Sequence, residues 1–146
     1  MGEVKKSVIC GAAVLIFLGA FLPAAAQQTV ARVTDEHVPT SRVFGRWAGT
    51  VTQPGLKPYS VVMTLGANGG ATDYPELRCS GELTSAGSDG QYLFFIEKIS
   101  RGRLDQGGQC FDGSITVVIA KTELAWGWVG DYDEKTVVAH ARLTRR

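Results

Sequence analysis

The sequence predicts an all-β fold, a small antiparallel up-and-down β-barrel of about eight strands. Apolar and polar residues alternate with a period of two in several short segments, and no window of the chain has a helical period. Turn signals separate these segments about every ten residues, which is typical of closed barrels and two-sheet sandwiches. The sequential hairpins and the 18 glycines favour the barrel, and a two-sheet β-sandwich is the alternative.

Short runs between turn signals define eight or nine candidate strands. They are 44–53, 59–65, 70–74, 78–84, 91–99, 106–111, 114–120, 124–129 and 136–144. In the last of these, Val137, Ala139, Ala141 and Leu143 share one side of the strand. The turns at 66–70, 85–90 and 130–135 are rich in residues that adopt tight turns, and we expect them at the surface.

The chain is predicted to have three parts, of which the first is a cleaved signal peptide over residues 1–26. Lys5 and Lys6 precede an uncharged apolar run that ends in Pro23 and three alanines, which is the pattern of an export signal. An uncleaved anchor is the alternative, whereas a lipoprotein is excluded because Cys10 lies at the start of the run. Residues 27–42 are predicted as a flexible leader and residues 43–146 as the barrel domain.

Composition excludes several classes of function. The chain has 15 basic and 14 acidic residues, and removal of residues 1–26 leaves 13 of each, because that segment holds two lysines and one glutamate. Without a basic surplus, nucleic-acid binding is not expected. With 45% hydrophobic and 20% charged residues, the mature chain is expected to be folded, without a membrane span and monomeric. A periplasmic or secreted location follows from the export signal.

Cys79 and Cys110 are the two cysteines outside the predicted signal peptide, and they predict one disulfide in an oxidising compartment. Such a bridge is worth about 3–4 kcal/mol on the chain-entropy model. A metal site would need two further ligands, yet His37 and His140 are both distant in sequence from the cysteines. Neither a metal nor a cofactor is therefore expected.

The segment Gly45-Arg46-Trp47 resembles the Gly-x-Trp opening of lipocalin-type barrels. In that family the tryptophan closes one end of the barrel, and a basic residue of the last strand packs across it. The resemblance implies that Trp47 forms such a cap with Arg142, or with Arg145. The chain from Trp47 through Tyr74-Pro75-Glu76-Leu77-Arg78-Cys79 to the second cysteine also resembles small secreted bacterial domains, and exported barrels that inhibit proteases or lysozymes.

The sequence offers few combinations of residues that could act as a nucleophile with a base or as an acid–base pair, so an enzyme is not expected. Both domain cysteines are assigned to the disulfide, and His140 is predicted to face outward from the last strand. The acidic cluster of Asp131, Asp133 and Glu134 lies with a glycine and a tyrosine in a predicted solvated turn, so it is not expected to form a catalytic cleft. A small hydrolase that uses Glu97 or Asp131 as an acid remains a minor alternative.

Glu97 and a set of aromatic residues are the candidate binding groups. Glu97 lies in an apolar strand, where a carboxylate needs a partner. Either it forms an internal ion pair at the barrel rim, with Arg78, Arg101 or Arg103 as candidates, or it makes a polar contact in a ligand pocket. The aromatic residues form either core packing or a binding surface. Trp126 and Trp128 share one strand face, and the neighbouring strands can direct Tyr59, Tyr92 and Phe94 inward if the strand register permits.

These observations favour a non-enzymatic exported binding module. In one version a small apolar ligand enters the barrel lumen and contacts Trp126, Trp128, Tyr59, Glu97 and Arg78. In the other version the turns 66–70, 85–90 and 130–135 dock onto a partner protein, as in an inhibitor of a hydrolase.

Overall fold

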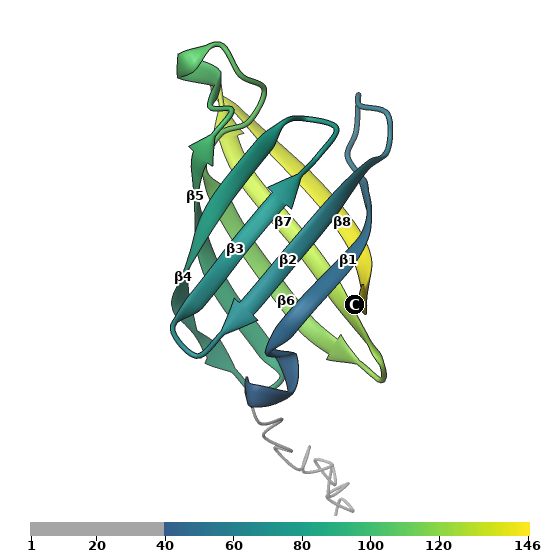
Figure 1. Cartoon of the computed structure of the whole chain (residues 1–146). Coiled ribbons are helices and arrows are strands. Elements are labelled where there is room, and N and C mark those ends of the chain that lie inside the picture. The colour runs from purple at the N-terminus through teal and green to yellow at the C-terminus, as the bar shows by residue number, and fades with distance from the viewer. Residues whose placement is uncertain (1–39) are drawn as a thin grey trace, which may run out of the picture. The chain divides into compact units, whose positions relative to one another are not determined.

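The structure, a computed structural model, describes residues 40–146, so the predicted signal peptide and residues 27–39 of the leader lie outside the described residues. Eight antiparallel strands form a closed barrel in which each strand pairs with the next and β8 pairs with β1 (Figure 1). The strands are β1 (Gly45–Thr52), β2 (Tyr59–Gly66), β3 (Gly69–Tyr74), β4 (Cys79–Asp89), β5 (Tyr92–Arg101), β6 (Gly113–Ala120), β7 (Glu123–Tyr132) and β8 (Lys135–Arg145). The predicted fold class is confirmed. No helix in the described part of the chain has the length and hydropathy needed to span a membrane.

The structure differs from the predicted strands in three places, one of which is β7, which continues to Tyr132 into the predicted turn 130–135. Residues 106–111 do not form a strand but belong to the β5–β6 loop, which contains the 3-10 helix η2 (Leu104–Gln106) and one isolated bridge between Arg103 and Cys110. Strand β4 continues to Asp89, through residues predicted as a turn, with a register shift between Ser85 and Gly87. The described chain also begins with a 3-10 helix, η1 (Thr40–Val43), which crosses the predicted boundary between the leader and the barrel domain.

Side chains fill most of the barrel interior. Alternate residues of the strands point inward, as the period of two requires. Those with exposures of 5% or less include Val51, Val61, Met63, Leu83, Ile115, Val117, Leu124 and Leu143. Burial of each such side chain contributes about 1.5–3 kcal/mol. This packed interior leaves no wide lumen in the middle of the barrel.

Trp47 closes one end of the barrel, which we call the sealed end. Its side chain is 4% exposed, and its indole Nε1 donates a hydrogen bond to the carbonyl of Val43 at 2.7 Å. The Arg145 guanidinium lies 4.4 Å from the centre of the indole and donates to the carbonyls of Phe44 and Arg42 at 2.7 Å each. These contacts hold η1 across the end of the barrel.

Arg142, the first-named partner for Trp47, does not belong to this cap. Ala141 and Leu143 are buried inside the barrel, so the residue between them points outward. Arg142 is exposed and bonds Glu123 on the outer surface at 3.4 Å. The expectation for Arg142 was therefore wrong, and Arg145, which shares the inward face with Leu143, takes the position.

The opposite end, which we call the open end, is surrounded by the connections 53–58, 75–78, 102–112 and 133–134 (Figure 1). The connections β2–β3, β4–β5 and β6–β7 lie at the sealed end, because successive strands alternate in direction. The predicted contact turns 66–70 and 85–90 are thus at one end, and 130–135 is at the other. They do not form one surface.

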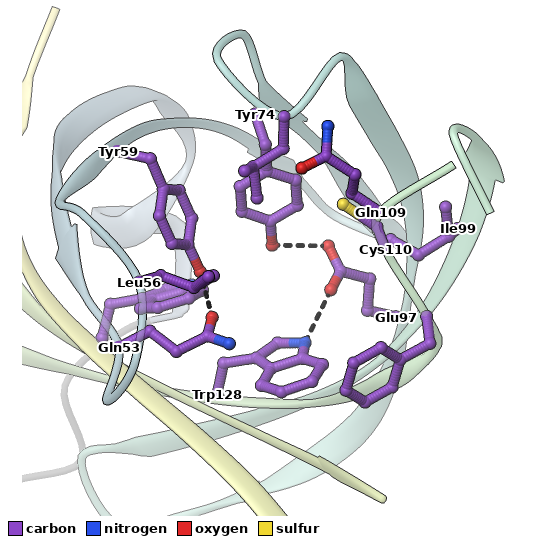
Figure 2. A pocket seen from close by; sticks show the side chains of 12 residues that line it. Gln53, Leu56, Tyr59, Tyr74, Glu97, Ile99, Gln109, Cys110 and Trp128 are labelled. Atoms are coloured by element: carbon purple, nitrogen blue, oxygen red, sulfur yellow. Dashed lines mark hydrogen bonds between the residues drawn. The ribbon is translucent and has the colours of Figure 1, made fainter. Parts of the chain in front are cut away.

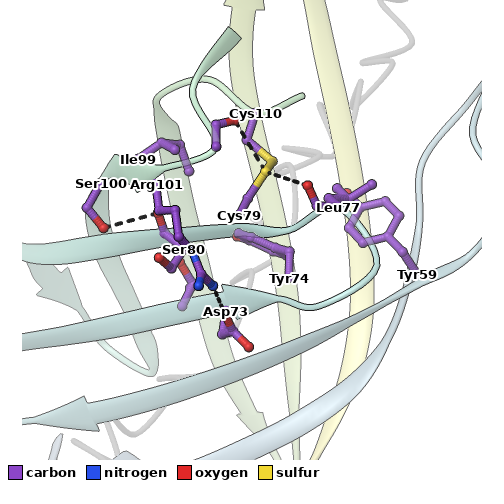
Figure 3. Close-up of a disulfide and its surroundings, with 12 residues drawn as sticks. Tyr59, Asp73, Tyr74, Leu77, Cys79, Ser80, Ile99, Ser100, Arg101 and Cys110 are labelled. Atoms are coloured by element: carbon purple, nitrogen blue, oxygen red, sulfur yellow. Dashed lines mark hydrogen bonds and ion pairs between the residues drawn. A yellow bond between two sulfur atoms is a disulfide. The ribbon is translucent and has the colours of Figure 1, made fainter. Parts of the chain in front are cut away.

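The disulfide between Cys79 and Cys110 is confirmed, with an S–S distance of 2.08 Å. It joins the start of β4 to the long β5–β6 loop at the open end (Figure 3). Gly102 allows this approach, because a Cβ there would lie 2.9 Å from Cys79 Sγ and 2.7 Å from the Arg78 carbonyl, and its φ of +78° favours glycine. The bridge fixes one wall of the open end.

Candidate functional site

A cavity of about 50 Å³ opens at the open end of the barrel (Figure 2). Its aromatic lining comes from several strands and from the β5–β6 loop. These residues are Tyr59, Tyr74, Phe111, Trp126 and Trp128, and the other lining residues are Gln53, Leu56, Leu77, Glu97, Ile99, Gln109 and Cys110. Glu97 is the one carboxylate in this lining, so it sets the charge of the cavity.

The strand period brings the lining residues together. Trp126 and Trp128 share the inward face of β7, as the sequence predicts, and Tyr59 is the buried first residue of β2. On β5 the inward residues include Phe95, Glu97 and Ile99. Tyr92 and Phe94 do not point inward, because the register places them on the outer face of β5.

Tyr92 and Phe94 are 47% and 37% exposed. Both faces of β5 are apolar in sequence, because Tyr92, Phe94 and Ile96 alternate with Leu93, Phe95 and Ile99. Hydrophobic pattern alone therefore does not decide which face of this strand is buried.

Glu97 is buried, with an exposure of 1%, and three uncharged donors bond its carboxylate. The Thr72 and Tyr74 hydroxyls donate to Oε1, the latter at 2.8 Å. The Trp128 indole N–H donates to Oε2 at 2.8 Å (Figure 2). Burial raises the pKa of Glu97, and the three hydrogen bonds offset part of this rise because they favour the charged form.

The predicted ion pair between Glu97 and an arginine was wrong. Arg78 is exposed and does not line the cavity. Arg101 pairs with Asp73 at 3.0 Å (Figure 3), and Arg103 pairs with aspartates of its own loop. Within residues 40–146, no ion pair includes Glu97.

The two tyrosines of the cavity act as hydrogen-bond donors. Burial, with a further contribution from the charge of Glu97, raises the pKa of Tyr59 to about 12. The same causes raise the pKa of Tyr74, so both phenols stay protonated at neutral pH. Tyr59 donates to Gln53 Oε1 at 2.7 Å, and its ring meets that of Tyr74 edge to face at 6.2 Å.

Two glycines give the Glu97 and Trp128 side chains their space. A Cβ on Gly81 would lie 2.9 Å from Glu97 Cγ and from Thr72 Oγ1. A Cβ on Gly113 would lie 2.5 Å from the Trp128 ring, whose other neighbour is the Phe111 ring at 5.2 Å. Sequence reasoning missed both roles, because Gly81 lies inside a predicted strand and Gly113 follows Asp112 in a dipeptide that is typical of turns.

Sequence reasoning also missed Thr72 and Tyr74. They lie two residues apart in β3 and therefore share a face, which is the signal that could have identified them together. Their contact with Glu97 spans 25 and 23 residues of sequence, and strand alternation does not predict such distant pairings.

The indole N–H of Trp126 has no hydrogen-bond partner within the part of the chain that the structure describes. The side chain is 3% exposed and lines the cavity, and Nε1 is a buried donor that bonds no other group among residues 40–146. A buried donor of this kind normally has a partner, because leaving it unpaired costs about 1–3 kcal/mol.

The remaining candidates lie outside the cavity. Asp131 is exposed and accepts a hydrogen bond from the Thr136 hydroxyl at 2.7 Å. His140 is exposed on β8, next to the inward Ala139 and Ala141. No cluster of three metal-ligating side chains occurs in the described range.

Comparison of the chain with protein-family models, with curated proteins and with solved structures found no match. The resemblance to lipocalin-type barrels therefore stays a prediction.

Proposed function

We propose that the protein is an exported, non-enzymatic binding module that holds a small ligand in the cavity at the open end of the barrel. The observation that supports this proposal is the aromatic cavity around a buried carboxylate, in a barrel whose other end is closed by Trp47. Apolar cavities with a few convergent polar groups are typical ligand sites.

The size of the cavity limits the ligand. Pockets for drug-sized molecules measure about 300–1,000 Å³, whereas this cavity measures about 50 Å³. The ligand therefore has only a few non-hydrogen atoms, with an apolar body that packs against the aromatic rings. A ligand that fills the whole lumen does not fit the packed interior.

Two features support the non-enzymatic and exported parts of the proposal. The cavity brings no nucleophile and base together, because Cys110 is in the disulfide and His140 lies on the outer surface. The disulfide itself is compatible with a periplasmic or secreted protein, since such bonds persist in oxidising compartments.

The alternative functions have less support. An inhibitor that docks through turns 66–70, 85–90 and 130–135 would need one contact surface, but these turns are divided between the two ends of the barrel. A hydrolase that uses Asp131 as an acid would need this residue in a cleft with a second group, whereas Asp131 is exposed in the hairpin of β7 and β8.

The test is a titration of the exported protein with a panel of small neutral, cationic and anionic molecules, followed by the indole N–H signals of its three tryptophans in NMR spectra. We expect at least one class to move the signals of Trp126 and Trp128 and to leave that of Trp47, at the sealed end, unchanged. If no class moves them, the proposed function is wrong.

Leu56→Ser tests the location of binding. Leu56 lines the cavity and is 50% exposed, so the substitution should weaken binding with little effect on stability. The matched control is Val138→Ser, since Val138 is 51% exposed on the outer surface of β8. Equal affinity losses in the two variants would contradict a site at the open end.

A further inference from the structure

The buried carboxylate of Glu97 accepts hydrogen bonds, but no cationic side chain among residues 40–146 pairs with it. Its three hydrogen bonds come from uncharged groups on Thr72, Tyr74 and Trp128. An ionised carboxylate offers about four acceptor positions, so one remains for a further donor. Its negative charge is not neutralised by any ion pair of the described chain. Because an unpaired buried charge is costly, a cation that entered the cavity would be strongly favoured over a neutral molecule.

The aromatic rings indicate what kind of cation fits. Figure 2 shows the Glu97 carboxylate directed into the cavity between Tyr74 and Trp128, with Tyr59 on the opposite side. Aromatic rings attract organic cations through their electron-rich faces. A hard metal ion would instead require about six oxygen ligands, and the residues described provide no cluster of metal-ligating side chains there.

Trp126 adds a second requirement for the molecule that occupies the cavity. Its buried indole N–H is a donor without a partner among residues 40–146, and its side chain lines the same cavity. An occupant that also carries an oxygen acceptor would satisfy this donor.

Resting on the proposed function, we propose that the cavity binds a small amino alcohol, whose ammonium group pairs with the Glu97 carboxylate and whose oxygen accepts from the Trp126 indole N–H. The limited volume of the cavity selects molecules of a few non-hydrogen atoms. The short carbon chain between the two polar groups packs against the aromatic lining.

The test uses three probes of nearly equal size: ethanolamine, n-propylamine and 1-propanol. Each is titrated into the exported protein, and the indole N–H signals of Trp126 and Trp128 are followed, with Trp47 as the internal control. We expect ethanolamine to bind at least about tenfold more tightly than 1-propanol, because hydrogen bonds to charged groups are the stronger ones. We also expect it to bind several-fold more tightly than n-propylamine, which has no oxygen.

Two variants assign these preferences to residues. Glu97→Gln should abolish the preference for ethanolamine over 1-propanol, whereas Glu76→Gln, which changes an exposed carboxylate bonded to Ser60 near the rim, should preserve it. Trp126→Phe should abolish the preference for ethanolamine over n-propylamine while it retains a large aromatic ring. The signal of Trp47 reports whether each variant is folded, and the comparison of probes in the wild type does not depend on the variants.

The outcomes distinguish this inference from the proposed function. Equal affinities of ethanolamine and 1-propanol in the wild type would overturn the inference, but binding of both at the open end would still support the proposed function. Equal affinities of ethanolamine and n-propylamine would overturn the role of Trp126. If none of the three probes moves the signals of Trp126 and Trp128, the inference is wrong, and the wider panel then decides the proposed function separately.

Discussion

At the scale of single residues, the direction in which a strand residue points decides its role. Arg142 and Arg145 are both basic and both lie in β8, but only Arg145 shares the inward face with Ala141 and Leu143. Its guanidinium consequently reaches Trp47, while Arg142 bonds Glu123 on the outer surface. The alternation of β8 was visible in the sequence and was sufficient to choose between the two arginines.

The cap gives the first prediction. Trp47→Ala should destabilise the protein by about 3–5 kcal/mol, as is usual for truncation of a buried tryptophan. Arg145→Ala should cost about 0.5–1 kcal/mol from the lost cation–π contact, and Arg142→Ala should stay within about 0.5 kcal/mol of the wild type. Urea unfolding of the three variants measures these values, and a larger loss for Arg142→Ala than for Arg145→Ala would contradict the assignment.

Glu97 gives a prediction on pH. Burial raises the pKa of Glu97 in the folded state, so the folded protein holds this proton more tightly than the unfolded chain does. The contribution to stability is complete below the unfolded pKa of about 4.3 and is lost as the pH rises through the raised folded value. The free energy of unfolding of the wild type minus that of Glu97→Gln should therefore increase as the pH falls from neutrality. Tyr59, Tyr74 and Asp112 face residue 97 in both proteins, so their own effects on the free energy of unfolding largely cancel in this difference.

Glu76→Gln is the matched control for this pH series. Hydrogen bonds from Ser60 lower the pKa of Glu76, so its contribution is present above the unfolded pKa and is lost as the pH falls through the lower folded value. The difference between wild type and Glu76→Gln should therefore decrease on acidification. If both differences change in the same direction, the burial argument for Glu97 fails.

At the scale of strands and loops, the sequence predicts the elements that carry a hydrophobic alternation and misses those that do not. The second half of β4, from Thr84 to Asp89, consists of exposed residues, so it has no apolar face that a period of two could reveal. Residues 106–111 end in the apolar Cys110 and Phe111 and were predicted as a strand. However, Gly107 adopts a φ of +79° and Gly108 packs against the backbone of Gly102. These backbone requirements keep the segment a loop.

Prediction of the candidate site was limited in the same way. Alternation within one strand placed Trp126, Trp128 and Tyr59 correctly on inward faces. The partners of Glu97 come from β3 and β7, and those contacts depend on the curvature of the closed barrel. The sequence therefore indicated that Glu97 needs a partner but did not identify Tyr74 and Trp128.

The contact between β6 and β7 gives a prediction at this scale. Gly113→Ala would place a methyl group 2.5 Å from the Trp128 ring, so the indole must move away and its hydrogen bond to Glu97 is lost. Overpacking of this kind costs about 1–3 kcal/mol, and the indole N–H signal of Trp128 should shift. The control is Gly127→Ala on β7, where a Cβ would meet no atom within 4 Å. Equal effects of the two substitutions would show that crowding of Trp128 is not the cause.

At the scale of the whole molecule, two different constraints hold the barrel together. The β1–β8 pairing closes the sheet through backbone hydrogen bonds. The disulfide links the start of β4 to the β5–β6 loop and does not take part in closure. The sealed end depends on packing around Trp47, whereas the cavity wall at the open end depends on a covalent bond through Cys110.

Removal of the disulfide should accordingly lower the free energy of unfolding but leave the barrel closed through the β1–β8 pairing. A variant with Cys79→Ala and Cys110→Ala should be less stable by about 3–4 kcal/mol, because the bridge restricts the unfolded chain. It should keep the far-ultraviolet circular dichroism of a β-barrel and should lose affinity at the open end. In the wild type, alkylation under denaturing conditions without reductant should label neither cysteine, and labelling of both would contradict the disulfide.

The two ends of the described chain leave the barrel on the same side. Residue 40 begins η1 across the sealed end, and the Arg146 amide donates to the Arg46 carbonyl at 2.8 Å, at the start of β1. An affinity tag or a solid support attached after Arg146 is therefore remote from the cavity. Protein immobilised through its C-terminus will present the aromatic opening to the solution in a uniform orientation, which makes such a surface suited to comparing weak ligands side by side.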